Sequence, residues 1–424
     1  MTNTLTNVII YSFEHRLGIE NKTERREVMK LPRGVEFIIS RLNEAGHRAD
    51  IVGGCVRDVL LGKEPNDYDI TTDAAPDKMR EIFSDVRTVD TGIKHGTLTV
   101  IIDSVPYEVT AYRLEGVYSD NRHPDSVSFT KILSDDLARR DFTVNAMCYN
   151  AKDGYTDLFF GKRDLERRII RAVGDPVKRF SEDALRILRA LRFASTLDFD
   201  IEENTAKAIF ETKELLLKAS AERIFTEWKK LIAGAGAYRI IKEYAPVISL
   251  IIPEFSRLRL PDEDRFLAAE PKIRELSLFA LSCERPAEAY ITAMQRLRSD
   301  NRRKNFGVSV LDSLSLPTSQ KNEQHILLVG CGWECAAGVM KLKILLGLSS
   351  EGELASLTDI INSGACYRIR DMRINGDDLK ALGFVGADIG NTLGALLYKI
   401  AKGEVKNERE ELVDFVKKNL TQER

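Results

Sequence analysis

Two aspartates lie one residue apart in the stretch NDYDITT, a spacing that could support metal chemistry. In a strand, residues i and i+2 point to the same face, so Asp67 and Asp69 would project side by side. Two carboxylates held that close raise each other's pKa unless a positive charge lies between them. Hard divalent cations such as Mg²⁺ bind carboxylate oxygens and bridge to substrate phosphates. The pair therefore predicts a Mg²⁺ site, with a polar turn ahead of a strand as the simpler alternative.

A third carboxylate could come from Glu108 in PYEVTAYR, on a neighbouring predicted strand. An exposed strand glutamate explains this residue equally well. Two ions held by such carboxylates activate an attacking oxygen and neutralise a leaving one. We therefore expect the catalytic set to be Asp67, Asp69 and Glu108.

A glycine pair precedes the acidic pair. Gly53 and Gly54 follow an apolar run and precede a short predicted helix. Glycines at such a place let backbone amides approach an anion closely, and Arg57 adds a charged donor suited to phosphate. Alone, the pair indicates only a turn, but beside the aspartates it predicts a phosphate cradle facing a metal site.

Basic residues cluster although the formal net charge is only -2. A low net charge argues against indiscriminate binding of polyanions but leaves a basic face possible. For any one cluster a solvated helix face is the simpler interpretation, whereas several together favour a phosphate-rich partner. The clusters comprise Arg163, Arg167, Arg168 and Arg171; Lys178 and Arg179; Arg186, Arg189 and Arg192; and Arg296, Arg298, Arg302, Arg303 and Lys304.

The pattern of apolar residues divides the chain into a mixed head and a helical remainder. Residues 1–28 have no clean period and are expected to be a loosely ordered extension. The stretch after Met29 predicts an amphipathic helix that leads to a strand. Short β-rich runs then alternate with turns from Ile51 to about Asp157, interrupted by a helix around 76–83, which predicts an α+β domain with a mixed sheet over 29–168. Helical periods then continue to the C-terminus, and we divide them into a neck (169–250), a body (251–340) and a tail (341–424).

Composition points to a cytoplasmic protein. No apolar run approaches the roughly 20 residues of a membrane span, and the N-terminus lacks the order of a signal peptide. Six scattered cysteines fit a reducing compartment. Cys331 and Cys335 form a C-x3-C pair, but no second pair follows at the spacing of a zinc site. The five histidines are isolated, and no His-Asp pair indicates a phosphohydrolase domain.

Three motifs in order carry a family resemblance. GGCVRDVLLG with DYDITT, then ARRDFTVNAM, then RFSEDALRILRALRF resemble the bacterial-type tRNA nucleotidyltransferase and poly(A) polymerase family. The resemblance runs from about Lys30 to Leu231 and resumes at INGDDLKALGF. It implies a polymerase-beta-like catalytic head followed by a helical neck, body and tail. One departure is Phe160, where the family usually has the first glycine of a pair.

The resemblance also implies roles for individual residues. Asp67 and Asp69 match the metal-binding pair. Asp141 and Asn145 would shape the nucleotide pocket. The nucleotide-binding positions are Gly54, Arg57, Arg140, Asp183, Arg186, Arg189 and Arg192, of which Asp183 and Arg186 match the pair that reads the incoming base without a template.

Side-chain chemistry supports a base-reading pair. At i and i+3 on one predicted helix, Asp183 and Arg186 would be neighbours on the same face. The carboxylate can accept from an exocyclic amino group, and the guanidinium can donate to a ring acceptor. Cytosine and adenine offer both groups, whereas guanine and uracil present a carbonyl where the amino group should be. An ordinary intrahelical ion pair is the alternative.

These features predict an enzyme that adds C, C and A to the tRNA 3' end from CTP and ATP, with no membrane and no obligatory protein partner. Narrower relatives, namely an A-adding enzyme, a CC-adding enzyme or a poly(A) polymerase, are the first alternative. A non-catalytic RNA-binding protein on the same scaffold is the second. The polar segment 113–129, which has no helical or strand period, resembles a flexible loop that CCA-adding and A-adding relatives possess.

Overall fold

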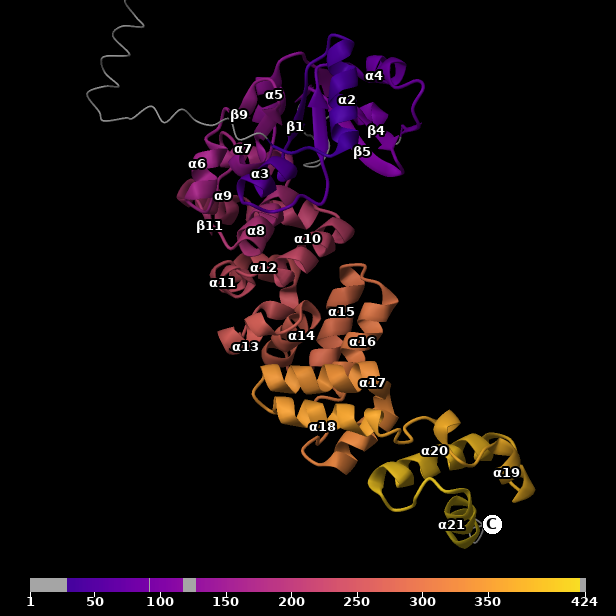
Figure 1. Ribbon diagram of the computed structural model, residues 1–424. Coiled ribbons are helices and arrows are strands. Elements are labelled where there is room, and N and C mark those ends of the chain that lie inside the picture. The colour runs from indigo at the N-terminus through magenta and orange to yellow at the C-terminus, as the bar shows by residue number, and fades with distance from the viewer. Residues whose placement is uncertain (1–28, 91, 117–126, 420–424) are drawn as a thin grey trace, which may run out of the picture. The chain divides into compact units, whose positions relative to one another are not determined.

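The computed structural model describes residues 29–90, 92–116 and 127–419 and divides them into two compact units. The head contains the described residues up to 167 together with 171–174. The helical unit contains 168–170 and the described residues from Asp175 onwards. Of the strands that Figure 1 labels, all but β11 (Asp200–Ile201) lie in the head, and helices make up nearly all of the other unit.

A seven-stranded sheet organises the head, in the order β3-β4-β5-β2-β1-β8-β9. Neighbouring strands are antiparallel except β2 and β5, which run parallel, so the predicted mixed sheet is confirmed. Strands β1, β2 and β8 are almost entirely buried, and they place the acidic stretch at the centre of the sheet. The strands are β1 Ala49–Val52, β2 Asp69–Thr72, β3 Thr88–Val89, β4 Thr97–Ile102, β5 Val105–Ala111, β8 Met147–Asn150 and β9 Gly154–Asp157.

Helices pack on this sheet through apolar faces. Helix α2 buries Val35, Ile38, Ile39 and Leu42, the spacing that puts residues on one helical face, and it contacts β1, β2 and β5. The sequence predicted α2, the short helix α3 and α4, but it missed two six-residue helices, α5 and α6. The helices are α2 Arg33–Glu44, α3 Gly54–Leu60, α4 Pro76–Ile82, α5 Leu133–Ala138 and α6 Gly161–Glu166.

Segment 113–129 was expected to have no regular structure, and at its ends this is wrong. Strands β6 (Arg113–Glu115) and β7 (Val127–Phe129) form an antiparallel pair. Residues 117–126 lie outside the described residues, and so does the predicted extension 1–28.

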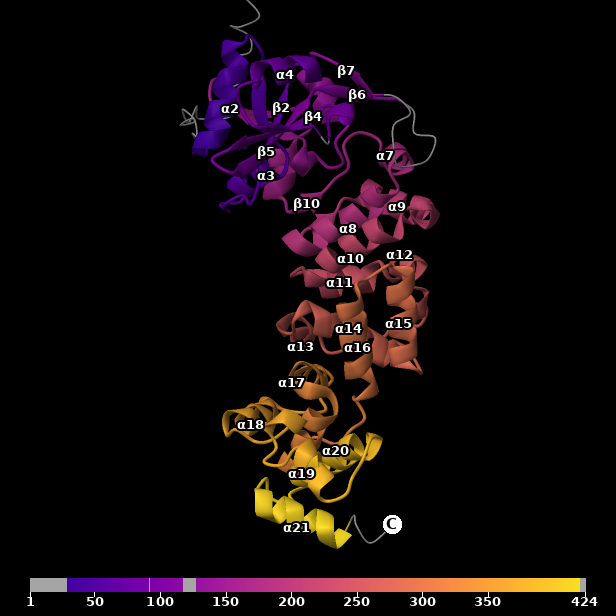
Figure 2. The ribbon, with the colours of Figure 1, turned by 90° about the vertical axis from the view of Figure 1, so that its right-hand side faces the viewer.

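The second unit is helical apart from a two-residue parallel pair, β10 (Ile169–Ile170) with β11 (Asp200–Ile201). Helices α15 and α16 lie side by side, as do α17 and α18 (Figures 1 and 2). The α-helices are α7 Pro176–Glu182, α8 Leu185–Leu197, α9 Glu203–Thr212, α10 Ala221–Ala233, α11 Ala237–Glu243, α12 Ala245–Ile251, α13 Glu263–Ala268, α14 Pro271–Ser282, α15 Pro286–Arg296, α16 Asn301–Asp312, α17 Lys321–Leu345, α18 Glu351–Asn362, α19 Gly376–Ala381, α20 Ala387–Lys402 and α21 Arg409–Asn419.

Buried polar groups connect these helices. Trp228 on α10 is fully buried, and its indole N–H donates to Glu275 on α14 at 2.7 Å. Arg303 on α16 pairs with the same carboxylate at 2.7 Å. The charge of Glu275 is thus compensated inside the core, as a buried carboxylate requires.

Helix α17 is kinked at Gly332, whose φ of 75° and ψ of 173° are open almost only to glycine. Among the described helices it alone is long and apolar enough to pass for a membrane span. Half of that apolar window is buried within the protein, and α14, α16, α18 and α20 pack against the helix. Such burial is typical of a core helix in a water-soluble fold.

Candidate nucleotidyl-transfer site

The acidic pair lies where β2 begins. The strand starts at Asp69, so Asp67 is in the irregular segment just before it, and the expectation that both occupy one strand is wrong. Glu108 on β5 is the direct partner of Asp69 in the parallel register, as expected for a neighbouring strand. All three residues are exposed on the surface of the head.

Electrostatics identify Asp69 as the centre of this acidic group. The pKa of Asp69 is raised to about 6, mainly because surrounding protein atoms desolvate the carboxylate, although part of the residue remains open to solvent. The charges of Asp67 and Glu108 raise this pKa further, whereas Arg140 lowers it. A carboxylate crowded by two others favours a cation beside it.

The acidic group fits a divalent cation that shares its coordination with substrate. Within residues 29–90, 92–116 and 127–419, no three His, Cys, Asp or Glu side chains form a complete metal-binding group. Mg²⁺ commonly takes only one or two protein carboxylates and completes its shell with water and phosphate oxygens. Two carboxylates, those of Asp67 and Asp69, are enough for this kind of Mg²⁺ coordination.

Gly53 brings the glycine turn, an arginine and the acidic group together. Its φ of 84° lies in the region that favours glycine. A Cβ at Gly53 would lie 3.1 Å from Nη1 of Arg140 and 3.9 Å from Oδ2 of Asp69. The turn between β1 and α3 thus passes closely beneath both side chains, and no side chain caps the first turn of α3.

Arg140 has an unused buried donor. Its Nη2 is 3.3 Å from Asp136, while its Nε is buried and has no hydrogen-bond partner in the described part of the chain. An unsatisfied buried donor is costly, and a phosphate oxygen beside it would remove that cost. The orphaned Nε is therefore an observation that favours an anionic ligand.

Hydrogen bonds connect Arg57, which follows the glycine turn, to Asn145 and then to Asp141. Arg57 donates to Asn145 Oδ1 at 2.7 Å and pairs with Asp58 at 2.7 Å. Asn145 in turn donates to Asp141 Oδ1 at 3.3 Å. The Arg-Arg-Asp motif and the glycine motif, separated by more than 80 residues, are thus joined in one network.

Asp136 is a positioning residue that the sequence did not reveal. It is fully buried, and it accepts hydrogen bonds from Arg139 at 2.6 Å, from Arg140 and from Thr71 on β2. It thereby joins strand β2 to Arg140, the arginine predicted to bind phosphate. The spacing of Asp136 from the two arginines, i+3 and i+4 in DDLARRD, was the available signal.

The base-reading pair has a different local structure from the one expected. Helix α7 ends at Glu182 and α8 begins at Leu185, so Asp183 and Arg186 do not share one helix. Asp183 has an extended backbone, and its Oδ1 accepts from the amide of Leu185 at 3.0 Å. Aspartate favours such local bonds over a helix interior, which explains the break.

Each member of the pair has an ionic partner of its own. Asp183 pairs with Arg223 on α10 at 2.7 Å, and Arg186 pairs with Glu182 at 2.6 Å. Arg223, 40 residues downstream, had no signal in the sequence. The roles of both residues in base reading stay predictions.

The two further arginines of α8 contact aromatic and acidic groups. Arg189 lies over the ring of Phe193, with 5.4 Å from its guanidinium carbon to the ring centroid. Arg192 lies over the same ring at 3.5 Å and donates to Glu227 at 2.9 Å. Their expected nucleotide contacts are predictions as well.

Comparison with known proteins identifies the family. Residues 49–171 match the Poly A polymerase head domain, and residues 198–245 match the probable RNA and SrmB-binding site of polymerase A. The CCA-adding enzyme of Lactococcus lactis subsp. cremoris is 38% identical over 400 residues, which cover 91% of this chain and 96% of that protein. The corresponding enzyme of Pediococcus pentosaceus is 36% identical over 389 residues, 90% of this chain and 96% of its own length.

A solved structure agrees in fold along nearly the whole length. The Bacillus stearothermophilus CCA-adding enzyme in complex with CTP matches with a TM-score of 0.77 and 30% identity, covering 93% of this chain and 99% of that one. These relatives confirm the resemblance predicted from the three motifs, including the polymerase-beta-like head and the helical remainder. The chain belongs to the family of CCA-adding enzymes, which are tRNA nucleotidyltransferases.

Proposed function

We propose that this protein adds C, C and A in turn to the 3' end of tRNA, using CTP and then ATP and releasing pyrophosphate. The observation that carries the proposal is the junction of Asp69, Arg140 and Gly53, which puts an acidic group and an unsatisfied buried cationic donor over a glycine turn. Relatives of near-equal length are named for this activity, and one was solved with CTP.

In the proposed reaction, the tRNA 3' hydroxyl attacks the α-phosphorus of the bound nucleotide, and the bond to pyrophosphate breaks. Asp67 and Asp69 would hold Mg²⁺, which supplies charge neutralisation at the triphosphate. The Nε of Arg140 would donate to a phosphate oxygen, and Arg57 would be aimed at the nucleotide by Asn145. Glu108 lies beside Asp69 and would complete the acidic group.

Base choice is proposed for the break between α7 and α8. Asp183 would accept from the amino group of cytosine or adenine, because Arg223 and the Leu185 amide hold its carboxylate in a fixed orientation. Arg186 would donate to the neighbouring ring acceptor, while Arg189 and Arg192 would add contacts to the nucleotide. Rejection of guanine and uracil then follows from unpaired polar groups.

We further propose that the helical unit works as a neck, a body and a tail that dock the acceptor end of tRNA through its backbone and shape. One enzyme must serve many tRNA sequences, so affinity should fall steeply with salt and depend little on acceptor-stem sequence. A cytoplasmic location is proposed on two grounds. The substrate is tRNA, and all six cysteines, which lie in the described residues, are free thiols.

The decisive experiment incubates the purified protein with tRNA that ends at the discriminator base. CTP alone should add two residues, and CTP with ATP should add three and then stop. Addition of a single A only to tRNA that already ends in CC would indicate an A-adding enzyme, and long A tails would indicate a poly(A) polymerase. Absence of any incorporation, with tRNA still bound, would overturn the proposal in favour of an RNA-binding protein.

A further inference from the structure

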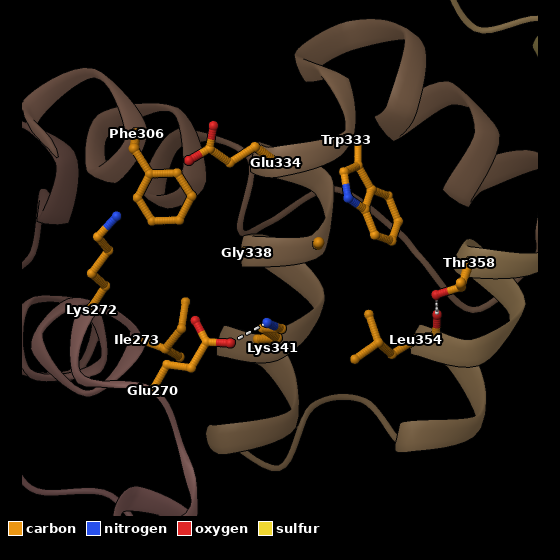
Figure 3. Close-up of a pocket in the computed structure, with 11 residues that line it drawn as sticks. Glu270, Lys272, Ile273, Phe306, Trp333, Glu334, Gly338, Lys341, Leu354 and Thr358 are labelled. Carbon is orange, nitrogen blue, oxygen red and sulfur yellow. Dashed lines mark hydrogen bonds and ion pairs between the residues drawn. The ribbon is translucent and has the colours of Figure 1, made fainter. Parts of the chain in front are cut away.

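A groove of about 530 Å³ opens in the helical unit, and none of the residues assigned to catalysis or nucleotide selection lines it. Figure 3 shows Gly338 on α17 in its middle. Ile273 of α14 and Phe306 of α16 line one side, and Leu354 of α18 lines the other. A volume in this range suits a small planar group rather than a single ion.

Trp333 is the most informative residue of the groove. It immediately follows the kink at Gly332 and is 39% exposed. The only other tryptophan, Trp228, is fully buried with its N–H hydrogen-bonded to Glu275. A large aromatic ring left half in water beside a groove is the usual form of a stacking platform.

Gly338 has no side chain, and this allows α16 to pack closely against α17 at the base of the groove. A Cβ at this position would meet Cζ of Phe306 at 2.9 Å and Cγ2 of Val310 at 2.8 Å. Helix α16 therefore packs directly on the backbone of α17, and the ring of Phe306 lies against the floor. The result is an apolar base with an aromatic group on either side (Figure 3).

The charged residues that line the groove are two lysines and two glutamates, and one of the lysines, Lys272, lacks a glutamate partner among them. Lys341 pairs with Glu270, and Arg302, just outside the lining, pairs with Glu334 at 3.3 Å. Lys272 lies 5.5 Å from the centroid of the Phe306 ring and has no ion pair among the described residues. One lysine without an ion pair can contact one phosphodiester, whereas a free nucleoside triphosphate would bring several negative charges to a lining that has no net positive charge.

We propose that this groove binds one unpaired nucleotide of the RNA substrate, with its base stacked on Trp333 and its phosphate near Lys272. The proposal rests on the proposed function, because it assumes that the protein holds an RNA. The contact would recognise an unstacked loop base as a shape, since every base has a face that can stack. It would increase the affinity for the RNA without selecting the nucleotide that is incorporated.

Replacement of Trp333 tests the affinity. Because one stacked base contributes about 1–3 kcal/mol, Trp333→Ala should raise the dissociation constant for tRNA about 5- to 150-fold, measured by anisotropy of labelled tRNA. Trp333→Phe should keep most of the affinity, and Leu348→Ala, which shortens another exposed apolar side chain of the unit, should change nothing. Unchanged thermal midpoints would show that each variant folds.

Activity separates this inference from the proposed function. At saturating tRNA, Trp333→Ala should add C, C and A at the wild-type rate. Wild-type protein that adds nothing would refute the proposed function, whereas active wild-type protein with equal tRNA affinity in Trp333→Ala would refute the groove. Lys272→Gln should reduce the slope of the logarithm of tRNA affinity against the logarithm of salt concentration by about one, as loss of one phosphate contact does.

Tryptophan fluorescence identifies the occupant. Unmodified tRNA should quench Trp333, and a blunt, fully paired RNA duplex should not, because it offers no unpaired base. Quenching by ATP or CTP alone at low concentration would show that the groove binds a free nucleotide, and this would overturn the proposal. Concentration-dependent dimerisation that Trp333→Ala abolishes would overturn it too, by making a second copy the occupant.

Discussion

Arg140 donates to the fully buried carboxylate of Asp136, which also holds Arg139 and the hydroxyl of Thr71. This relationship links Arg140, for which we propose a contact with phosphate, to the strand that begins with Asp69. Removal of the carboxylate leaves two arginines without their counter-charge, and removal of the arginine leaves a buried charge less well compensated.

Asp136→Asn should therefore impair nucleotide binding more than RNA binding. We expect the KM for both CTP and ATP to rise about 10-fold, on the order of the 1–3 kcal/mol that a charged hydrogen bond contributes, with the tRNA dissociation constant unchanged. Arg139→Gln, which leaves the link to Arg140 in place, is the matched control and should have a smaller effect. Equal loss of tRNA binding would show that Asp136 supports only the fold.

The same residue predicts a pH dependence of stability. Burial by itself raises the pKa of Asp136, but Arg139 and Arg140 outweigh burial and hold this pKa below its ordinary value near 4. A depressed pKa contributes stability at pH values above the ordinary one, and this contribution is lost as the pH falls through the folded-state pKa. The difference in unfolding free energy between wild type and Asp136→Asn should shrink from pH 6 to pH 3, as measured by urea titrations. A constant difference would contradict the charged pair.

Asp67→Ala or Asp69→Ala should abolish both C and A addition and leave tRNA affinity nearly unchanged. Phosphoryl transfer depends on charge neutralisation at the triphosphate, and either change removes a ligand of the proposed cation. Asp77→Ala, an exposed aspartate of α4, serves as the control and should retain full activity. Turnover near the wild-type level in either variant would remove these aspartates from the metal site.

Base selection should depend on Arg223 as well as on Asp183. Asp183→Ala removes a selecting hydrogen bond, so use of UTP and GTP relative to CTP should rise more than CTP use falls. Arg223→Ala leaves the carboxylate in place but frees its orientation, and we expect a smaller shift in the same direction. The measurement is the ratio of kcat/KM among the four nucleotides. Wild-type ratios in Asp183→Ala would make this pair structural.

Phe160 has a left-handed backbone, with φ of 62° and ψ of 32°, at the start of α6. Such a backbone costs a bulky residue about 1–2 kcal/mol, part of which the guanidinium of Arg163, 4.8 Å from the ring centroid, offsets. Phe160→Gly should raise the unfolding free energy by up to about 1 kcal/mol. Phe160→Ala keeps the strain, loses the ring contact and should lower it.

Gly161, the residue after Phe160, provides a control in which a side chain is added where there is no room for one. A Cβ at Gly161 would lie 2.3 Å from the carbonyl oxygen of Thr143, so Gly161→Ala should destabilise the protein. Thermal unfolding midpoints of the three variants check the order. A lower midpoint for Phe160→Gly than for wild type would show that the aromatic ring, rather than backbone strain, controls this turn.

The sequence predicted the features that depend on the spacing of apolar residues within short segments and on sequence motifs. Alternation of apolar residues indicated the strands of the head, and an acidic pair beside a glycine turn indicated the site. Glu108 could be assigned to a neighbouring strand, but its parallel register opposite Asp69 comes from the sheet as a whole. Helices α5 and α6 were missed because six residues are too few to display a helical period.

Other features depend on residues far apart in the chain. A helical period runs through Asp183, so the sequence could not show that a local hydrogen bond to Leu185 breaks the helix there. Arg223 pairs with Asp183 only because α10 packs against α8. Asp136 is buried by tertiary structure, and its charged neighbours made it resemble a surface residue.

The order of the strands has a consequence for synthesis of the protein. The central strand β1 pairs on one side with β8, and Asn150 donates to the carbonyl of Ala49 at 2.8 Å across 101 residues. Contacts this distant in sequence form slowly because a long loop must close first. A chain still on the ribosome therefore exposes an edge of β1 until β8 emerges, and the same late segment brings Asn145 to Arg57. The pairing of β1 with β8 and the hydrogen bond between Arg57 and Asn145 therefore both wait for the same segment of the chain. A nascent chain that ends before Asn145 would lack both and would expose an unpaired edge of β1.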